Sequence, residues 1–232
     1  MNIVILTGAG ISAESGLETF RDQGGLWSQY DVEDVATPQA YARNPALVHE
    51  VSNLLRRINR TANPNAAHFA LADLESRHDG NFLLVTQNID TLHQRAGSRN
   101  VLHMHGSIEV ALCSDCGHTW PAPDEMSEDD CCMVCRKNQC RPDLVWFGEN
   151  VRFLDEIEAA TEAADLFAFI GSSGEVYPAA GLMELAQESG AKTVEINLHP
   201  SAVASAADEV ILGPAGHVVP KWVEKTIHSA VL

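Results

Sequence analysis

The stretch GAGISAESGLETFRDQGGLW, residues 8–27, decides the fold of this 232-residue chain. It follows the apolar run IVIL of residues 3–6, which predicts a buried strand, and its glycines stand where a helix is expected to begin. Gly8 to Ala13 fit the pattern G-x-G-x-x-G/A of dinucleotide-binding turns. In that pattern the first glycine allows a tight turn, the second lets the backbone approach a pyrophosphate, and the helix start offers N–H groups to the anion. A glycine-rich turn without a ligand is the alternative that this motif alone leaves open.

The composition is that of a globular protein with one medium-sized domain, or with one domain that carries a smaller module. Hydrophobic residues make up 45% of the chain and charged residues 20%, and the formal net charge is −17. This charge argues against nucleic acid as a partner and favours neutral or cationic ones. No apolar run approaches the ~20 residues that span a bilayer, and the N-terminus lacks the pattern of a secretory signal. We therefore expect a cytoplasmic protein without a membrane partner.

Short apolar runs alternate with longer amphipathic stretches, which predicts an α/β fold with a parallel sheet covered by helices on both faces. The expected strands are Ile3–Thr7, Phe82–Thr86, Leu166–Gly171, Thr193–Asn197 and Glu209–Leu212. The expected helices are Pro45–Arg57, Asn65–Arg77, Phe153–Ala164, Ala179–Ser189 and one near Val218–Ser229. The interval from Ser107 to roughly Pro142 interrupts this alternation, because it is polar, rich in cysteine and without helical periodicity.

Polar and small residues follow the predicted strands where the strands end. Residues 86–90 (TQNID), 171–174 (GSSG) and Asn197 occupy such positions, and residues 103–106 (HMHG) lie between two of the strands. Because ligands bind at the carboxyl ends of parallel strands, we expect these groups to share one site. The acidic residue that dehydrogenases carry ~20 positions after the glycine motif is missing from its usual context, which makes an ordinary dehydrogenase less favoured. Asn197 is the better candidate for a contact with a ribose.

The cysteine-rich interval predicts a metal site. Two C-x-x-C pairs with 15 residues between them supply four candidate ligands: Cys113, Cys116, Cys132 and Cys135. This spacing is typical of a structural zinc site, in which four thiolates leave no position open for a substrate. Disulfides are less favoured in a reducing compartment. Cys131 and Cys140 are surplus, and Cys131 is an alternative to Cys132. We expect one Zn²⁺ that holds together a segment without a core of its own.

Eight segments, taken in order, resemble those of the sirtuins, the NAD-dependent protein deacylases. They are GAGISAESG, TFRDQGGLW, TQNIDTLHQRAG, HMHGS, the two C-x-x-C pairs, RPDLVWFGE, GSSGEVYPAA and INLHP, and they extend over essentially the whole chain. The resemblance implies an α/β fold, a Rossmann-like parallel sheet with a small inserted zinc-binding module and a helical insertion. The implied boundaries are 1–25, 63–106 and 148–232 for the NAD-binding domain, 26–62 for the helical insertion and 107–147 for the zinc module. The active site would lie in the cleft between them.

The resemblance implies a large set of NAD-binding residues. Its members are Gly8, Ala9, Gly10, Ser12, Glu14, Phe20, Arg21, Trp27, Gln87, Asn88, Ile89, Asp90, Gly171, Ser172, Ser173, Asn197 and Ala215. In this set Phe20 would shield the reactive ribose carbon from water after nicotinamide leaves, and Arg21 would approach a phosphate. A packing role of Phe20 against the core is the alternative.

His105 resembles the catalytic histidine of the family, and Asn88 belongs to the same catalytic set. A base that works near neutral pH needs a pKa close to the ambient pH, and histidine meets this need. The resemblance implies that the acyl oxygen attacks C1′ of the NAD ribose and expels nicotinamide, after which His105 deprotonates the ribose diol. The products are free lysine and O-acyl-ADP-ribose.

The resemblance also assigns residues to the substrate, an acylated lysine in a protein: Val145, Phe147, Gly148, Glu149, Ser52 and Leu55. The first two would line the acyl-lysine tunnel, and residues 148–149 would pair with the peptide main chain as an added strand. A purely structural strand is the alternative for residues 145–149.

The helix that carries Ser52 and Leu55 departs from part of the family. Relatives that remove succinyl groups carry a tyrosine and an arginine three residues apart, and Ser52 and Leu55 stand at the matching positions. Neither residue binds an anion strongly, and Arg56 and Arg57 project from other faces of the helix. We therefore expect neutral acyl groups, acetyl first, with longer apolar chains admitted beside Leu55.

Two other functions remain open at this point. An ADP-ribosyltransferase or an NAD hydrolase would use the same NAD pocket with a different acceptor, and would release nicotinamide without an acylated peptide. A non-catalytic module would use the zinc segment as an interaction platform. The presence of Phe20, Arg21, Asn88, Asp90 and His105 argues against the second of these.

Overall fold

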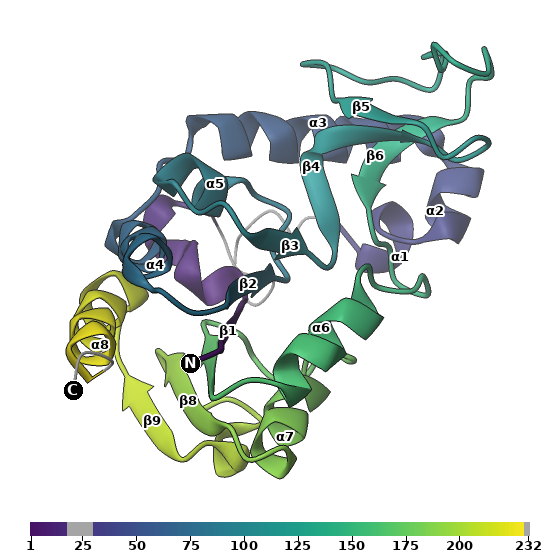
Figure 1. The fold of residues 1–232 in the computed structure, drawn as a ribbon. Helices are drawn as coiled ribbons and strands as arrows, with labels where there is room; N and C mark the ends of the chain where they lie inside the picture. The colour runs from purple at the N-terminus through teal and green to yellow at the C-terminus, as the bar shows by residue number, and fades with distance from the viewer. Residues whose placement is uncertain (18–29, 230–232) are drawn as a thin grey trace.

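The computed structural model describes residues 1–17 and 30–229, and its larger part is a six-stranded parallel sheet (Figure 1). The strands are β1 (Ile3–Thr7), β2 (Phe82–Thr86), β3 (Val101–His103), β7 (Leu166–Ile170), β8 (Lys192–Asn197) and β9 (Glu209–Leu212). Their order is β3-β2-β1-β7-β8-β9, with every neighbouring pair parallel. The sheet extends to β3 on one side of β1 and to β9 on the other, so the loops after β1 and β7 meet at the point where the strand order reverses. Ligands bind at such points in open α/β sheets.

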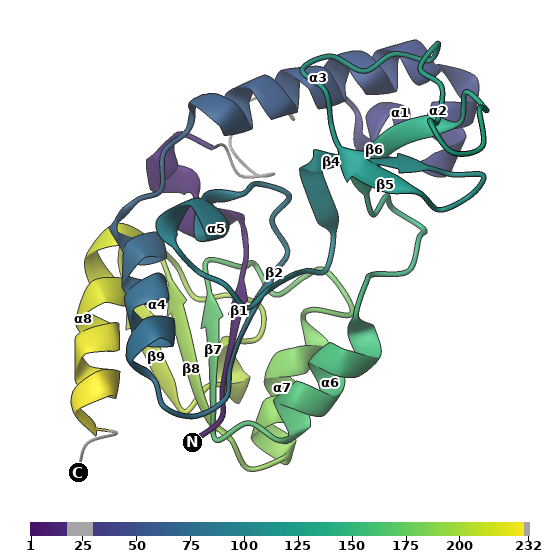
Figure 2. The ribbon, with the colours of Figure 1, turned by 45° about the horizontal axis from the view of Figure 1, so that its top comes forward.

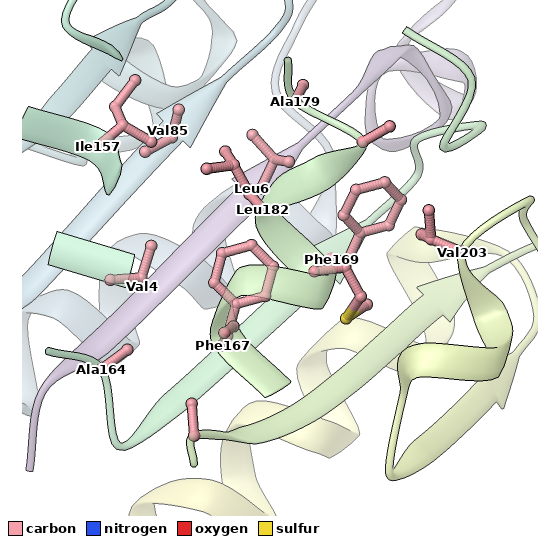
Figure 3. Close-up of a cluster of buried hydrophobic side chains, with 14 of the residues drawn as sticks. Val4, Leu6, Val85, Ile157, Ala164, Phe167, Phe169, Ala179, Leu182 and Val203 are labelled. Atoms are coloured by element: carbon pink, nitrogen blue, oxygen red, sulfur yellow. The ribbon is translucent and has the colours of Figure 1, made fainter. Parts of the chain in front are cut away.

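Helices cover both faces of this sheet, as Figures 1 and 2 show. The helices α4 (Ala66–Arg77) and α8 (Ala215–Ser229) lie on one face, whereas α6 (Leu154–Glu162) and α7 (Gly181–Glu188) lie on the other. The side chains of β7 alternate between the two layers: Phe167 and Phe169 pack toward α6 and α7, and Ala168 and Ile170 pack toward α4 and α8. Figure 3 shows both phenylalanines beside Leu182 of α7. Burial on both faces explains why these strands are almost wholly apolar.

A second unit combines helices and a three-stranded antiparallel sheet (Figure 2). It contains α1 (Val32–Val35), α2 (Pro38–Arg43), α3 (Pro45–Thr61), β4 (Gly106–Cys113), β5 (Thr119–Pro121) and β6 (Cys140–Leu144), with the strand order β5-β4-β6. Both α2 and α3 begin with proline after a capping residue, Thr37 or Asn44. Each cap accepts a hydrogen bond from a backbone N–H of the first turn, at 3.0 and 3.2 Å, which fixes where the two helices start.

Arg56 connects α3 to the small sheet. Its side chain is fully buried, Nε donates to the carbonyl of Ile108 of β4 at 2.9 Å, and Nη1 donates to Oδ1 of Asn53 at 2.7 Å. Asn53 in turn bonds both the N–H and the carbonyl of Met126, at 3.0 and 2.8 Å. Burial lowers the pKa of Arg56. The oxygen acceptors offset that cost, and α3 and the cysteine-rich segment therefore pack as one unit.

The predicted strands and helices are all present, with small shifts at their ends. Two predictions are wrong. The glycine motif opens into two short 3₁₀ turns, Ala9–Ile11 and Ala13–Ser15, rather than an α-helix, and Gly16 then adopts a left-handed φ of 83°. The cysteine-rich interval does have a core of its own, because Ala111, Ala122 and Met126 are buried with the cysteines of β4–β6.

None of the helices in the described part of the chain combines the length and the apolar content that crossing a bilayer requires.

Candidate active site

A cleft of about 1660 Å³ lies between the carboxyl ends of the parallel strands and the second unit. The loops after β1, β2, β7 and β8 form one wall, and α3, the start of β4 and the segment after β6 form the other. Among the described residues that line it there is no lysine or arginine, whereas four are acidic: Glu14, Asp90, Glu149 and Glu175. The described lining thus offers no cationic side chain to a negatively charged substituent.

The glycine turn packs directly on the loop after β7. The N–H of Gly8 donates to the carbonyl of Ile170 at 2.9 Å, and that of Gly10 donates to the carbonyl of Gly171 at 2.7 Å. A Cβ on Gly10 would lie 2.8 Å from that same oxygen, and one on Gly8 would lie 2.8 Å from Cα of Ser172. The second glycine is therefore required for close contact with the loop after β7.

Ser12, Asn88 and Asp90 form a buried hydrogen-bonded group at the floor of the cleft. The hydroxyl of Ser12 donates to Asp90 Oδ2 at 2.9 Å and accepts from the amide of Asn88 at 3.1 Å. The same amide donates to the carbonyl of Gly8 at 3.2 Å. Burial raises the pKa of Asp90, while hydrogen bonds from Leu92 and Ser12 lower it. Each partner holds the next, and the amide oxygen of Asn88 is left as the group available to a ligand.

His68 of α4 lies behind this group and was not singled out from the sequence. Its Nε2 is 3.4 Å from the hydroxyl of Ser12, and its Nδ1 accepts from the N–H of Asn65 at 3.3 Å. Since the Ser12 hydroxyl already donates to Asp90, the proton of His68 belongs on Nε2. Burial lowers the pKa of His68 to about 4, so the ring is neutral at physiological pH. A histidine on an apolar helix face gives no sequence signal that separates this role from ordinary packing.

His105 lines the cleft with the geometry of a base. Its Nδ1 donates to the carbonyl of Gln87 at 2.9 Å, which places the proton of the neutral ring on Nδ1 and leaves Nε2 as the acceptor. Burial lowers the pKa of His105, and the bond to Gln87 partly opposes this. Strand β3 ends at His103, and His105 lies in the turn that follows. Nδ1 of His103 donates to the carbonyl of Asn88 at 3.1 Å, beside the acceptor of His105.

The loops after β7 and β8 are bonded to each other beneath the cleft. Gln87 donates to the hydroxyl of Ser172 at 2.7 Å, and the amide of Asn197 donates to the carbonyl of Ser172 at 2.7 Å. At the far end, Glu14 accepts from the N–H of Gly216 at 2.6 Å, where α8 begins beside Ala215. The predicted NAD-binding residues in the described part of the chain come from five separate stretches and are thus gathered in one cleft. Ile89 and Ser173 also line it.

Residues 145–149 form the opposite wall, in a shape that differs from the predicted strand. The N–H of Val145 donates to the carbonyl of His105 at 2.9 Å, and that of Phe147 donates to Ala36 at 3.0 Å. Gly148 has a left-handed φ of 91°, and the N–H of Glu149 donates back to Trp146 at 2.9 Å. The chain therefore turns at Gly148 instead of continuing as an extended edge, and the N–H of Glu149 is occupied within the turn.

One face of α3 completes this wall. Val51, Ser52, Leu55 and Ile58 line the cleft together with Ile108 of β4. The hydroxyl of Ser52 donates to the carbonyl of Val48 at 2.7 Å, so it is satisfied within its own helix. The adjacent arginines of α3 point elsewhere, as expected: Arg56 is bound in the core of the second unit and Arg57 pairs with Glu125 at 2.5 Å. The third arginine of the helix, Arg60, pairs with Glu109 at 2.7 Å.

The sulfur atoms of Cys113, Cys116, Cys132 and Cys135 all lie within 4.8 Å of one another. The sulfur atoms of Cys113 and Cys135 are 3.5 Å apart, and those of Cys116 and Cys132 are 3.7 Å apart. Four thiolates around a tetrahedral Zn²⁺ at ~2.3 Å place sulfur atoms ~3.8 Å apart, so this group fits one zinc ion. Cys131 lies outside it, exposed, with its sulfur 3.7 Å from the carbonyl of Asp129. The choice between Cys131 and Cys132 therefore falls on Cys132.

Three predicted residues cannot be placed in the cleft, and two groups of residues line it that were not predicted. Phe20, Arg21 and Trp27 lie outside the described residues. Two groups that line the cleft were not assigned to it from the sequence, namely residues 175–177 and 198–202. Val176, Tyr177 and Leu198 among them are exposed. Their positions directly after the polar ends of β7 and β8 are the signal that could have identified them.

The fold and the cleft define the class: a Rossmann-type dinucleotide-binding protein with an inserted four-thiol module. Residues 8–178 match the Sir2 family, and the chain belongs to this family. An NAD-dependent protein deacylase of Caulobacter vibrioides is 52% identical over 231 residues, which cover 98% of this chain and 97% of the relative. A solved complex of a Sir2 homologue with NAD has a TM-score of 0.90 at 38% identity, covering 99% of this chain and 90% of that one. A Sir2 protein bound to a myristoylated histone peptide has a TM-score of 0.75 at 35% identity, covering 99% and 92%.

Proposed function

We propose that this protein is an NAD-dependent protein-lysine deacylase that transfers the acyl group to ADP-ribose and releases nicotinamide. The observation that carries the proposal is His105, whose ring is neutral, holds its proton on Nδ1 and lines the same cleft as Ser12, Asn88 and Asp90. Relatives named as NAD-dependent protein deacylases, and Sir2 structures that contain NAD and acylated peptides, support the same function. Acylated lysine side chains of proteins are then the substrates.

His105 would act as the general base. NAD, when bound, supplies an electrophilic ribose carbon with nicotinamide as the leaving group, and a ribose hydroxyl that accepts the acyl group. Nε2 of His105 would take the proton of that hydroxyl, because Nδ1 already holds one and is fixed by Gln87. Asn88 would orient nicotinamide and its ribose through its amide oxygen, while Ser12 and Asp90 keep that amide in place.

The other NAD contacts are proposed from the lining of the cleft. They are Gly8, Ala9, Gly10, Glu14, Gln87, Ile89, Gly171, Ser172, Ser173, Asn197 and Ala215, with Phe20, Arg21 and Trp27 as proposed contacts from the sequence. We also propose the division into residues 1–25, 63–106 and 148–232 for NAD, with 26–62 and 107–147 as the insertions. The zinc ion would hold the second of these. A four-thiol zinc site requires reduced cysteines, which supports the proposed cytoplasmic location.

The acyl group is proposed to be neutral, and acetyl first. Ser52 and Leu55 line the cleft on an α3 face that is otherwise aliphatic, and the described lining contains no lysine or arginine. A carboxylate on the acyl chain would lose its hydration there without gaining a cationic partner from these residues. Val145 and Phe147 would enclose the lysine stem, and the turn at Gly148 and Glu149 would contact the peptide.

Incubation with NAD and peptides carrying acetyl-, butyryl- or succinyl-lysine tests the proposal. We expect nicotinamide release to require an acylated peptide and to be slowest with succinyl-lysine. Release at full rate without peptide would instead identify an NAD hydrolase or an ADP-ribosyltransferase. His105→Ala should lower kcat by about 10²–10⁴-fold while the protein remains folded by circular dichroism. Unchanged activity in that variant would contradict the role of His105.

A further inference from the structure

Glu195 is a buried carboxyl group that the proposed mechanism does not use. It lies in β8 between Phe169 of β7 and Val210 of β9 in the register of the sheet, and it is completely inaccessible to solvent. Residues 167 and 169 of β7 pack toward α7 on that face, where Figure 3 also shows Val203. One oxygen, Oε1, accepts from the N–H of Ser201 at 2.7 Å. The other oxygen has no hydrogen-bond partner among the described residues.

Such a group is costly to the fold. A buried carboxyl oxygen without a partner loses its hydration and gains nothing in return, whereas an apolar side chain would suit the neighbouring phenylalanine. The other buried polar side chain on this face of β8, Thr193, is bonded to both Ala206 and Asp208. The hydrogen bond from the N–H of Ser201 is therefore the feature of Glu195 that indicates a role.

That bond holds a loop that lines the cleft. All five residues from Leu198 to Ala202 contribute to the lining, and they follow Asn197 directly. Two hydrogen bonds join the loop to described residues beyond its immediate neighbours 197, 203 and 204: Glu195 to Ser201, and the N–H of Ala202 to the carbonyl of Ser173 at 3.0 Å. Without Glu195, only the second of these two bonds would remain, at the end of the loop farthest from Asn197.

We propose that Glu195 is a positioning residue for NAD, which sets the loop 198–202 as the wall of the cleft beside the ribose contact Asn197. The inference rests on the proposed function for the identity of the dinucleotide. Glu195 acts from beneath the loop and touches no substrate. It should therefore govern the affinity for the ADP-ribose part of NAD, and leave the peptide site and the base His105 unaffected.

Thr193→Val is the matched control. Thr193 lies two residues from Glu195 on the same strand face and is also fully buried. Its hydroxyl donates to the carbonyl of Ala206 at 2.9 Å and accepts from the N–H of Asp208 at 2.9 Å. Neither partner lines the cleft. This variant therefore removes buried hydrogen bonds from the same strand without releasing the loop.

Calorimetric titration with ADP-ribose, together with steady-state kinetics, tests the proposal. Glu195→Met keeps the length of the side chain but removes the acceptor, and should weaken ADP-ribose binding and raise KM for NAD by about five-fold or more, with kcat and the KM for peptide unchanged. Glu195→Gln keeps an oxygen acceptor for Ser201 and should retain most of the affinity. Hydrogen exchange should be faster in residues 198–202 of the Met variant, and Thr193→Val should bind ADP-ribose as the wild type does.

Wild-type affinity in Glu195→Met, or an equal loss in Thr193→Val, would overturn the proposal. Should Glu195→Met not fold, Glu195→Asp asks the same question, because its carboxyl group is one methylene short of the Ser201 N–H and should show the same loss. Binding of ADP-ribose does not depend on deacylation. A wild-type protein that binds ADP-ribose but removes no acyl group would therefore contradict the proposed function and leave this inference open to its own test.

Discussion

Of the two adjacent cysteines, Cys132 should be required for zinc binding and stability, whereas Cys131 should not, so Cys132→Ser and Cys131→Ser should differ in both. The sulfur of Cys132 is fully buried within the four-thiol group, 3.7 Å from that of Cys116. Cys131 is exposed, and its sulfur has only a long contact with the carbonyl of Asp129. Sequence spacing alone allows either residue to complete the zinc site, so this pair of variants tests what the fold adds to the spacing.

The expected difference in stability between the two variants follows from the part of the zinc-binding free energy that one thiolate ligand contributes. Structural zinc contributes an apparent ~10–16 kcal/mol in small domains, so one of four thiolates corresponds to roughly 3 kcal/mol. The core around the cysteines is small, with Ala111, Ala122 and Met126 as its other buried members, and does not replace that contribution. An exposed Cys131→Ser change should alter the free energy of unfolding by less than about 0.5 kcal/mol.

Chelator competition measures this directly. Zinc should leave Cys132→Ser at roughly 100-fold lower concentrations of a chromogenic chelator than the wild type, as ~3 kcal/mol requires, and the thermal transition should fall. Cys131→Ser should match the wild type in both assays. Zinc loss from Cys131→Ser with retention by Cys132→Ser would refute the assignment, and equal loss from both would show that the measured ion is held by another arrangement.

Three further results are expected. The kcat/KM of deacylation should fall on acidification only below the ordinary histidine pKa of 6.5, because burial lowers the pKa of His105 and the neutral ring is the active form; a profile that falls already above that pH would contradict this. Gly10→Ala should lose about 1–3 kcal/mol of stability in denaturant titrations, together with NAD affinity, because its Cβ would meet the backbone of Gly171. Leu55→Arg should raise succinyl-peptide turnover relative to acetyl-peptide turnover, because it adds a cation to a lining that offers none among the described residues. An unchanged ratio would show that the acyl group does not approach α3.

The sequence was sufficient for features that depend on short spacing and on periodicity. Two glycines after an apolar run located the turn at Gly8, and polar residues after three other runs located Gln87, Ser172 and Asn197 at the same edge of the sheet. These inferences succeed because parallel strands present their carboxyl ends together, whatever the details of the connections. The two C-x-x-C pairs succeeded for a similar reason, since each pair is a local structure.

Features that depend on contacts between distant segments could not be read in this way. The turn after β1 is 3₁₀ rather than α-helical because Gly10 bonds to Gly171 and Ser12 bonds to Asp90, both far away in sequence. Arg56 reads as a solvent-facing charge on a helix, yet it is buried against a strand more than fifty residues later. Glu195 likewise reads as a solvent-facing charge, yet it is fully buried. Gly10, Arg56 and Glu195 each bond to a backbone group, and backbone groups leave no mark in the sequence.

His105 lies in the short link between β3 of the large sheet and β4 of the small sheet, and this position connects the zinc module to the chemistry. Strand β3 of the large sheet ends at His103 and β4 of the small sheet begins at Gly106. The ring of His105 is fixed by the carbonyl of Gln87 in the large unit, whereas its own carbonyl accepts from Val145 in the segment that follows β6. A module that loses its metal would release the second of these constraints first. Zinc removal should therefore reduce kcat as well as peptide affinity, because the base and the peptide wall are held by the same pair of strands.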